Sequence, residues 1–508
     1  MVITCLSSVL AAVLLSLSYP PFGWAFLVWI ALVPLLWAVS HSRRGIEAVL
    51  CGLIFTVVFG CFSVCGLSNI SVPVWLLAPL KESLYFMLFS GFAYVGIRSA
   101  KNIYLKVLWI ALAWLVCEFL RAETPLFPLG WNLLAYSQAS CVPIIQFANI
   151  FGSWGLSFLI ALVNAAVFFI WEKSRESKSV AGLLLIIGAV FAGLLTYGNV
   201  LLSKPLKPTP HVRLSVLQGN IPQSIKWMHQ YRRRILDIHL ELTRLAAEEK
   251  PDLIIWPESS FPGYFNTDHH SELVCALAKE IGIPLLVGGL YWVTEQEAYN
   301  SAYFIGNDGR PLQHYDKIKL VPFAEYTPLK FLLGGLKPVL RIVSAHDFTV
   351  GQKKVIFQWS KKEYPFAVLI CFEDAFHDLA RDFVDRGARF LVVITNDAWF
   401  GKTGEPYQHL QASIFRAVEN GVPVVRAANT GVSGFISSRG ELLASVKDAA
   451  GERTFIAGQK TYDLPVGCEK TFYRRWGYLF PYFSMLIFAG LGLFLLRKRE
   501  ALSTAEGV

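Results

Sequence analysis

The chain has 508 residues, of which 54% are hydrophobic, and it contains 15 Trp and 37 Phe. This composition excludes an ordinary soluble enzyme, and the length indicates more than one structural unit. The net charge of +9 lies largely in short basic loops, and no basic face accompanies a known nucleic-acid motif, so we expect no nucleic-acid partner.

Apolar segments predict a polytopic α-helical membrane domain of about eight transmembrane helices. A helix needs about 20 apolar residues to cross a hydrocarbon core of about 30 Å. The segments are 3–18, 22–40, 47–66, 74–97, 105–121, 154–171, 180–202 and 478–496. The first segment has no basic stretch before it and a second span follows at once, which favours an uncleaved anchor over a signal peptide.

Basic residues in the short loops predict the orientation of these spans. Lys and Arg gather at 41–47, 98–106, 172–178 and 497–500, and the intervening loops have almost none. The positive-inside rule places these four segments, and therefore both termini, in the cytoplasm. In a bacterial inner membrane, the large polar segment would then be periplasmic. We expect three parts: helices in 1–203, a catalytic domain in 204–475, and a last helix with a basic tail in 476–508.

The polar segment follows a Pro-rich linker at 204–210 and reads as one α/β domain. Apolar runs of Val, Ile and Leu alternate with helical patterns, which is typical of sheets covered by helices. The expected strands are 212–220, 252–258, 284–292, 366–371, 388–397 and 423–429. The expected helices are 224–249, 271–281, 375–386 and 407–420.

Several of these strands end in chemically reactive side chains. In α/β sheets, sites gather beyond the carboxyl ends of strands. Three strands deliver Glu258, Cys371 and the Asn396–Asp397 pair, and the stretch 313–328 adds Lys317, Lys319 and Glu325. A Cys nucleophile, a Glu base and a Lys cation form an acyl-transfer set that needs no His. The alternative for Cys371 is that it packs as a small hydrophobe.

Cys371 lies where an apolar strand is expected to turn into a helix. A helix N-terminus and a nearby Lys ammonium both stabilise a thiolate, so we expect them to lower the pKa of Cys371. Competing motifs fail. "GKT" at 401–403 lacks the phosphate-loop glycine at position 396, the His residues show no metal spacing, and His269–His270 reads as an exposed loop. We expect no metal and no cofactor.

At these residues the chain resembles the apolipoprotein N-acyltransferases, a membrane branch of the nitrilase superfamily. The matching stretches are "QGNIPQSIKW" (218–227), "WPES" (256–259), "YDKIKLVPFAEYTP" (315–328), "LICFEDAF" (369–376), "NDAWFG" (396–401) and the segment 408–434. The resemblance implies an α/β-β/α sandwich domain with a Glu258–Lys317–Cys371 triad. It also selects Lys317 over Lys319, which strand alternation alone leaves open because both side chains point to one face.

The resemblance implies further supporting and substrate-binding residues. They are Glu325, Glu373, Trp227, Trp399, Asn396 and Phe372. Phe372 stands where the family commonly has Tyr, and Ala324 replaces a usual Gly. As alternatives, the two Trp residues are core or membrane-interface aromatics, and the two Glu residues are members of structural ion pairs.

The reaction implied by the resemblance is a ping-pong acyl transfer. A fatty acyl chain passes from a phospholipid, with phosphatidylethanolamine expected, to Cys371 as a thioester. It then passes to the α-amine of the N-terminal diacylglyceryl-cysteine of an apolipoprotein. The partners expected are therefore a phospholipid donor and a diacylated apolipoprotein acceptor, and we expect a monomer. The alternatives are a membrane-tethered amidase or hydrolase, and a lipid-binding scaffold with a dead nitrilase-like domain.

Overall fold

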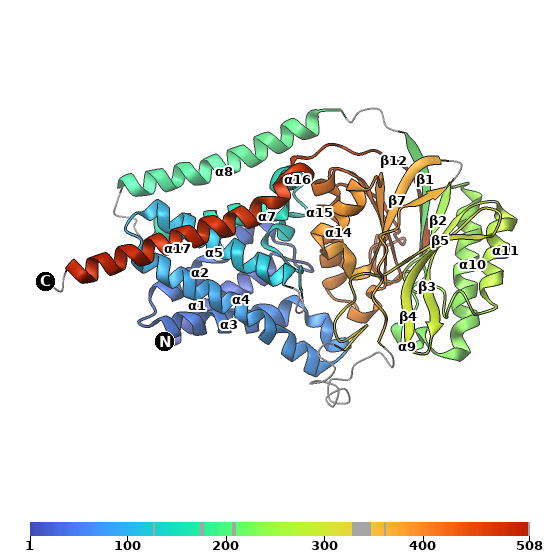
Figure 1. Ribbon diagram of the computed structural model, residues 1–508, viewed down its shortest axis with the longest axis horizontal. Helices are drawn as coiled ribbons and strands as arrows, with labels where there is room; N and C mark the ends of the chain where they lie inside the picture. The colour runs from blue at the N-terminus through green and yellow to red at the C-terminus, as the bar shows by residue number, and fades with distance from the viewer. Residues whose placement is uncertain (125–127, 173–176, 206–209, 328–346, 360–361, 506–508) are drawn as a thin grey trace. The chain divides into compact units, whose positions relative to one another are not determined.

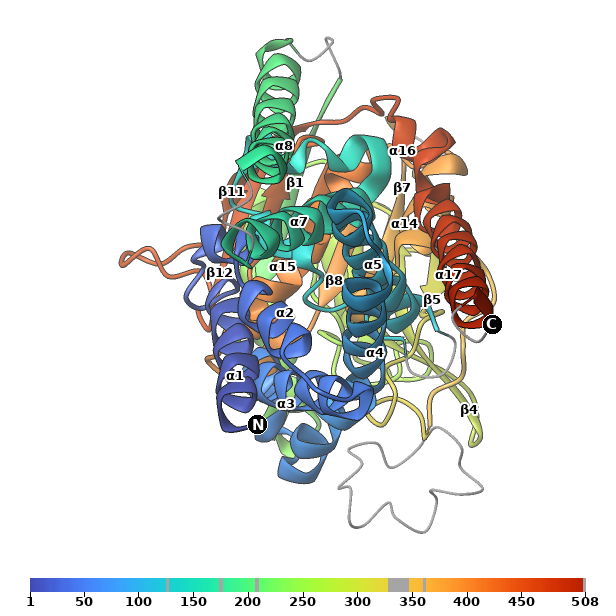
Figure 2. The same cartoon turned by 90° about the vertical axis from the view of Figure 1, so that its left-hand side faces the viewer.

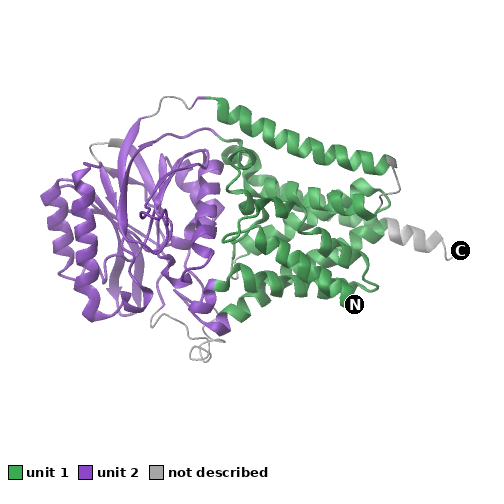
Figure 3. Cartoon of the chain, turned by 180° about the vertical axis from the view of Figure 1, so that it is seen from behind, with its two compact units in different colours: residues 1–65, 75–204, 471–508 green, residues 66–74, 205–470 purple. Residues whose placement is uncertain are grey.

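The computed structural model describes residues 1–124, 128–172, 177–205, 210–327, 347–359 and 362–505. It divides into two compact units, shown in green and purple in Figure 3. Unit 1 contains 1–65, 75–204 and 471–508, and unit 2 contains 66–74 and 205–470. Most of the expected basic loop 172–178 and of the linker 204–210 lies outside the described residues.

Unit 1 is helical, as the apolar segments predicted. Its helices are α1 (Val2–Leu17), α2 (Val33–Ser40), α3 (Gly45–Ser63), α4 (Val72–Ser99), α5 (Ile103–Glu123), α6 (Val142–Ile145), α7 (Ala148–Glu172), α8 (Ser177–Ser203), α16 (Phe472–Arg475) and α17 (Phe480–Ala505). Among the described residues, six helical segments are long and apolar enough to cross a membrane. They correspond to the predicted spans from the third to the eighth, and α1 is a shorter apolar helix.

The predicted span 22–40 is not one helix. It consists of a short 3₁₀ helix, Ala25–Trp29, and the eight-residue α2. Pro34 lies in the first turn of α2, where its missing N–H costs no hydrogen bond. A single continuous helix would need that N–H in its interior, so the proline starts a new helix instead.

The long helices of unit 1 differ in how much of their surface packs against protein. In α5 and α7, 67% and 72% of the most apolar window is buried, against 11% in α8 and 22% in α17. In Figure 2, α8 stands at the upper edge of this unit and α17 at its right-hand edge. The apolar side chains of α8 and α17 are therefore left for lipid, because the unit does not bury them.

Unit 2 contains two six-stranded sheets. The first has the order β12-β1-β2-β3-β4-β5 and the second the order β11-β10-β9-β8-β7-β6. The strands of the first sheet are β1 (His211–Gln218), β2 (Leu253–Ile255), β3 (Leu285–Thr294), β4 (Glu297–Ile305), β5 (Pro311–Asp316) and β12 (Gly458–Pro465). Those of the second are β6 (Phe357–Trp359), β7 (Lys362–Ile370), β8 (Phe390–Thr395), β9 (Val424–Ala428), β10 (Gly434–Ile436) and β11 (Leu442–Ser445).

Each sheet has a parallel centre and antiparallel edges. The neighbours β1, β2 and β3 run parallel, as do β7, β8 and β9, and the outer strands pair antiparallel. The central strands are apolar on both faces because both faces are covered. The six strands expected from apolar runs are all present. The short β6, β10 and β11 and the more polar β4, β5 and β12 were missed.

Helices cover the outer face of each sheet, as Figure 1 shows. The pair α10 (Arg232–Glu248) and α11 (Ser271–Ile281) packs on the first sheet, and α14 (His377–Asp385) and α15 (Glu405–Asn420) pack on the second. The result is an α/β-β/α sandwich, which confirms the predicted fold class. Under α10 and α11 lies a fully buried core that includes Trp256, Leu236 and Val287.

The predicted helix 224–249 is wrong in its first third. The chain forms a four-residue helix, α9 (Gln223–Lys226), then a 3₁₀ turn, and only then α10. Trp227 and Met228 separate α9 from the turn, and they are 46% and 47% exposed. An amphipathic helix would carry these apolar side chains on a buried face, and here the local packing does not bury them.

Candidate active site

The three predicted triad residues follow strands at their carboxyl ends. Glu258 comes three residues after β2, Lys317 directly after β5, and Cys371 directly after β7. β2 belongs to the first sheet and β7 to the second, so both sheets contribute residues to the site. This agrees with the expectation that reactive groups gather beyond strand ends.

Close backbone contacts fix the turns that carry these residues. A Cβ on Gly288 would lie 2.3 Å from the carbonyl oxygen of Pro257 and 2.8 Å from the Cα of Glu258. Only glycine therefore lets β3 approach the Glu258 turn so closely. Cys371 itself has a φ of +55°, which a non-glycine residue adopts at a strain. Such strain at a nucleophile is common where a sharp turn presents its side chain.

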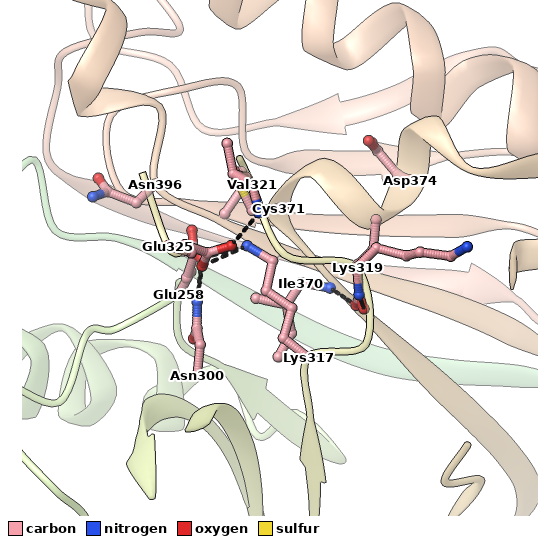
Figure 4. A network of polar contacts seen from close by, with 12 residues as sticks. Glu258, Asn300, Lys317, Lys319, Val321, Glu325, Ile370, Cys371, Asp374 and Asn396 are labelled. Atoms are coloured by element: carbon pink, nitrogen blue, oxygen red, sulfur yellow. Dashed lines mark hydrogen bonds and ion pairs between the residues drawn. The ribbon is translucent and has the colours of Figure 1, made fainter. Parts of the chain in front are cut away.

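Lys317 is the centre of the polar network, as Figure 4 shows. Its Nζ donates to Glu325 Oε1 at 2.9 Å and to Glu258 Oε1 at 3.5 Å. Asn300 of β4 donates from one Nδ2 to the same two oxygens, at 2.8 Å to Glu258 and 2.9 Å to Glu325. An ammonium and an amide thus hold two buried carboxylates in fixed positions.

Lys319 takes no part in this network. Its Nζ lies 3.9 Å from Asp378 and 4.8 Å from the centre of the Phe376 ring, and its side chain is 35% exposed. Figure 4 shows Lys319 directed away from the carboxylates that Lys317 contacts. Of the two lysines between which strand alternation left the choice open, the turn after β5 places only Lys317 in contact with these two carboxylates.

Glu373 links the segment after β5 to the end of β7 through hydrogen bonds. Its fully buried carboxylate accepts hydrogen bonds from the Tyr315 hydroxyl at 2.8 Å and from three main-chain amides. These amides belong to Ile318 at 2.7 Å, Lys319 at 3.0 Å and Ile370 at 2.7 Å. Burial raises the pKa of Glu373 to about 7, against the effect of the amides. The geometry gives Glu373 a positioning role between β5 and β7.

The electrostatics of Cys371 correct one expectation. Burial raises the pKa of the Cys371 thiol well above its usual range, the Glu258 carboxylate raises it further, and Lys317 lowers it. The five residues Cys371–Ala375 form only a short 3₁₀ helix, so the expected helix N-terminus is weak. Together these effects favour the neutral form of the Cys371 thiol.

A fully buried charged cluster lies next to Cys371. It is formed by Asp374, Asp397, His409 and Arg426. His409 faces Asp397 Oδ1 with Nδ1 at 2.8 Å and Asp374 Oδ1 with Nε2 at 3.0 Å. Arg426 donates to Asp374 Oδ2 at 2.9 Å. His409 Nε2 also lies 3.3 Å from the carbonyl oxygen of Cys371. Two carboxylates and two cations thus balance beneath the Cys371 turn.

The remaining predicted residues fall outside the Lys317 network. Asn396 bonds Gln223 and Asn429 through its amide, both at 2.9 Å, and so ties the 218–227 segment to the end of β8. Phe372 is 8% exposed. Trp399 is half-buried and Trp227 is exposed, so Trp227 is not a core aromatic.

Three residues that contact Glu258 or Cys371 were not predicted from the sequence: Asn300, His409 and Lys226. Lys226 is 2% exposed, and its Nζ donates to the carbonyl oxygen of Glu258 at 3.1 Å. Lys226 and His409 lie inside stretches that carried the resemblance, "QSIKW" and 408–434, but nothing in their local pattern marks them. Asn300 lies in the polar strand β4, which was itself missed.

The predicted surface loop with His269 and His270 also contains a nearby carboxylate, that of Asp268. Ligand atoms of Asp268, His269 and His270 lie within 4.8 Å of one another. His270 Nδ1 is 2.8 Å from Asp268 Oδ1, and Arg232 is 3.7 Å from the same carboxylate. The side chain of His269 is 82% exposed, as expected of a surface loop.

Comparison with known proteins decides the family. The model of the carbon-nitrogen hydrolase family matches residues 213–458, and that of the apolipoprotein N-acyltransferase N-terminal domain matches residues 11–166. An apolipoprotein N-acyltransferase of Geobacter metallireducens is 34% identical over 500 residues, which cover 94% of this chain and 92% of the relative. The chain belongs to the apolipoprotein N-acyltransferase family.

Other apolipoprotein N-acyltransferases are similarly related. That of Haemophilus influenzae is 30% identical over 509 residues, covering 96% of this chain and 93% of the relative. Among solved structures, an amidase from Nesterenkonia sp. is 20% identical with a TM-score of 0.39, covering 54% of this chain and 95% of the other. The chain's membership of the apolipoprotein N-acyltransferase family makes it an acyltransferase and a bacterial membrane protein, with a lipoprotein acceptor. Membership of this apolipoprotein N-acyltransferase family favours the predicted activity over the amidase and scaffold alternatives.

Proposed function

We propose that Cys371, Glu258 and Lys317 transfer a fatty acyl chain from a phospholipid to a diacylated apolipoprotein in two steps. The observation that carries this proposal is the convergence of a buried base and a buried cation, 3.5 Å apart, beside the half-buried Cys371 thiol. A base and a cation next to a nucleophilic thiol are the groups that acyl transfer requires.

In the first step, the Cys371 sulfur attacks the ester carbon of the phospholipid, with phosphatidylethanolamine as the proposed donor. Glu258 accepts the thiol proton, and the Lys317 ammonium stabilises the oxyanion of the tetrahedral intermediate. When the intermediate collapses, the bond from carbon to the ester oxygen breaks and Glu258 returns the proton to the departing oxygen. Lysophospholipid leaves, and a thioester remains on Cys371.

In the second step, the free α-amine of the diacylglyceryl-cysteine attacks the thioester carbon. Glu258 takes a proton from the amine and passes it to the Cys371 sulfur as the carbon–sulfur bond breaks. The products are an amide on the lipoprotein and the regenerated thiol. The protein surroundings that desolvate Cys371 also limit the access of water, which would otherwise compete with the amine.

The test is the covalent intermediate itself. Full-length protein incubated with phosphatidylethanolamine and no acceptor should gain the mass of one acyl group on Cys371, which neutral hydroxylamine should remove. Adding a diacylglyceryl-cysteine peptide with a free amine should discharge the adduct, and an N-acetylated peptide should not. Rapid discharge by water would favour a hydrolase, and no adduct from folded protein would favour a scaffold.

Two variants and one control test the roles of Glu258 and Lys317. Glu258→Gln and Lys317→Ala should abolish adduct formation, because each removes a charge that the first step uses. Lys319→Ala is the matched control, since its ammonium faces Asp378 rather than the two carboxylates. An adduct that forms at the wild-type rate in either of the first two variants would remove that residue from the mechanism.

We also propose a monomer with both termini in the cytoplasm, with residues 204–475 forming a periplasmic catalytic domain between the helices of 1–203 and 476–508. The alternation of basic loops supports this orientation. In intact spheroplasts, an impermeant thiol reagent should label a Cys placed at the exposed His269, and should not label one placed at Lys101. The opposite pattern would place the catalytic domain in the cytoplasm. The mass of the detergent-solubilised protein tests the monomer.

A further inference from the structure

Lys226 is a second buried lysine at the active site, and the Glu–Lys–Cys mechanism gives it no role. It ends α9, and its Nζ hydrogen-bonds the main-chain carbonyl of Glu258 at 3.1 Å. Its charge also interacts with the Glu258 carboxylate and with Cys371. Taking an ammonium out of water is costly unless the site compensates it, so its presence next to the base requires a reason.

The reason lies in the charges of the Lys317 network. Two carboxylates, Glu258 and Glu325, share the single Lys317 ammonium at 3.5 Å and 2.9 Å. They also share one neutral donor, the amide of Asn300. Two carboxylates with one cation leave one negative charge without compensation in a buried site. Two like charges that share one cation repel each other in a buried site, so the network favours a second cation nearby.

Lys226 is the group that can supply the missing positive charge. The other ionisable groups facing it are Cys371 and His239 of α10. Burial lowers the pKa of His239 to about 4 and raises that of Cys371 far above neutrality, so both are uncharged at pH 7. Asp397, which also acts on Cys371, is already matched by His409 at 2.8 Å. Two carboxylates then face two ammonium groups.

We propose that Lys226 is a positioning residue for the acyl transfer, which compensates the charge of the second carboxylate beside Lys317 and holds the Glu258 turn through its carbonyl oxygen. The inference rests on the proposed function, because it concerns the base of the first step. It predicts that loss of the Lys226 charge changes the pH range of the reaction as well as its rate.

The experiment is the pH dependence of adduct formation in full-length protein with phosphatidylethanolamine. In Lys226→Met, the acidic limb of the rate profile should move to higher pH by about one unit or more, the usual effect of removing a nearby opposite charge. Lys319→Met removes the same charge from a side chain that faces Asp378, and its profile should not move. Lys226→Arg should keep the wild-type limb if the larger side chain is accommodated.

A double variant tests the charge balance directly. Lys226→Met combined with Glu325→Gln removes one positive and one negative charge, so its acidic limb should return toward the wild-type position even where the rate is low. The inference would be overturned if Lys226→Met lowered the rate of adduct formation by the same factor at every pH and left the position of the acidic limb unchanged. A wild-type protein that forms no adduct would instead contradict the proposed function.

A measurement on the unmodified chain covers the case in which the neutral variants do not fold. Burial lowers the pKa of Lys226 to about 8, so its charge disappears within reach of experiment. The logarithm of the rate of Cys371 alkylation by iodoacetamide should rise with pH and then bend near pH 8. A straight line through this range would show that Lys226 does not influence the thiol, and would overturn the inference.

Discussion

His409 offers a quantitative test of the buried charged cluster. Both ring nitrogens face carboxylate oxygens, Asp397 at 2.8 Å and Asp374 at 3.0 Å, so both have to carry hydrogens. Burial alone would lower the pKa of this imidazole, but the two carboxylates outweigh it and raise the pKa to about 9. The imidazolium is therefore the form that the fold stabilises.

The expected magnitude follows from linkage. The pKa of His409 rises from 6.5 to about 9, and one unit corresponds to about 1.4 kcal/mol, so the charged form contributes on the order of 3 kcal/mol. Because the folded-state pKa is raised, the folded protein holds a proton that the unfolded chain has lost between these values. This stability is complete below about pH 6.5, and it is lost as pH rises through about 9.

The measurement compares the full-length protein with His409→Gln, which carries no charge and can donate to one carboxylate only. The free energy of unfolding of unit 2 is measured in detergent from about pH 6 to about pH 10. Glu373 and Lys226, with pKa values of about 7 and about 8, affect both proteins alike and cancel in the difference. His269→Gln, at an 82% exposed side chain, is the control.

The difference in unfolding free energy between wild type and His409→Gln should be largest at about pH 6 and should shrink steadily toward about pH 9. A difference that stays constant over this range would refute the reasoning, because it would mean that His409 is neutral in the folded protein. A constant effect would then reflect only lost packing.

Two further predictions concern the turns around the site. Glu373→Ala leaves four donors without their acceptor, two of them fully buried, so unfolding should become easier by roughly 2–6 kcal/mol in a denaturant titration, whereas Glu280→Ala at an exposed pair should change little. Gly431→Ala would place a Cβ 1.9 Å from Asp397 Oδ2. It should lower the unfolding temperature markedly, and an unchanged melting curve would show that the loop can move aside.

The sequence was sufficient for features that depend on local pattern. Apolar runs predicted the membrane helices and the central strands, because burial on both faces leaves a continuous signature. The ends of β2 and β7 were visible because Glu258 and Cys371 interrupt apolar runs. The resemblance then joined these positions into a triad.

The other residues of the site could not be predicted, because their contacts join positions far apart in the sequence. Asn300 meets Glu258 across 42 positions, and His409 meets Cys371 across 38, and neither has a local pattern that distinguishes it from an ordinary polar residue. Lys226 was missed for a different reason. The stretch 224–249 reads as one amphipathic helix, in which a Lys is expected at the surface, and only the break after α9 reveals that it is buried.

The expectation that the pKa of Cys371 is lowered was wrong because it left out desolvation. A thiol near a Lys was expected to ionise, but desolvation and the neighbouring Glu258 carboxylate outweigh the Lys317 ammonium, and so the pKa of the thiol rises. In the proposed mechanism, the neutral thiol is less reactive at rest, and it becomes a nucleophile only when Glu258 accepts its proton in the presence of an ester. In the same proposal, the desolvation that raises the pKa of the thiol also helps to exclude water from the thioester. For the proposed transfer these effects agree, because the intermediate has to survive until an amine arrives.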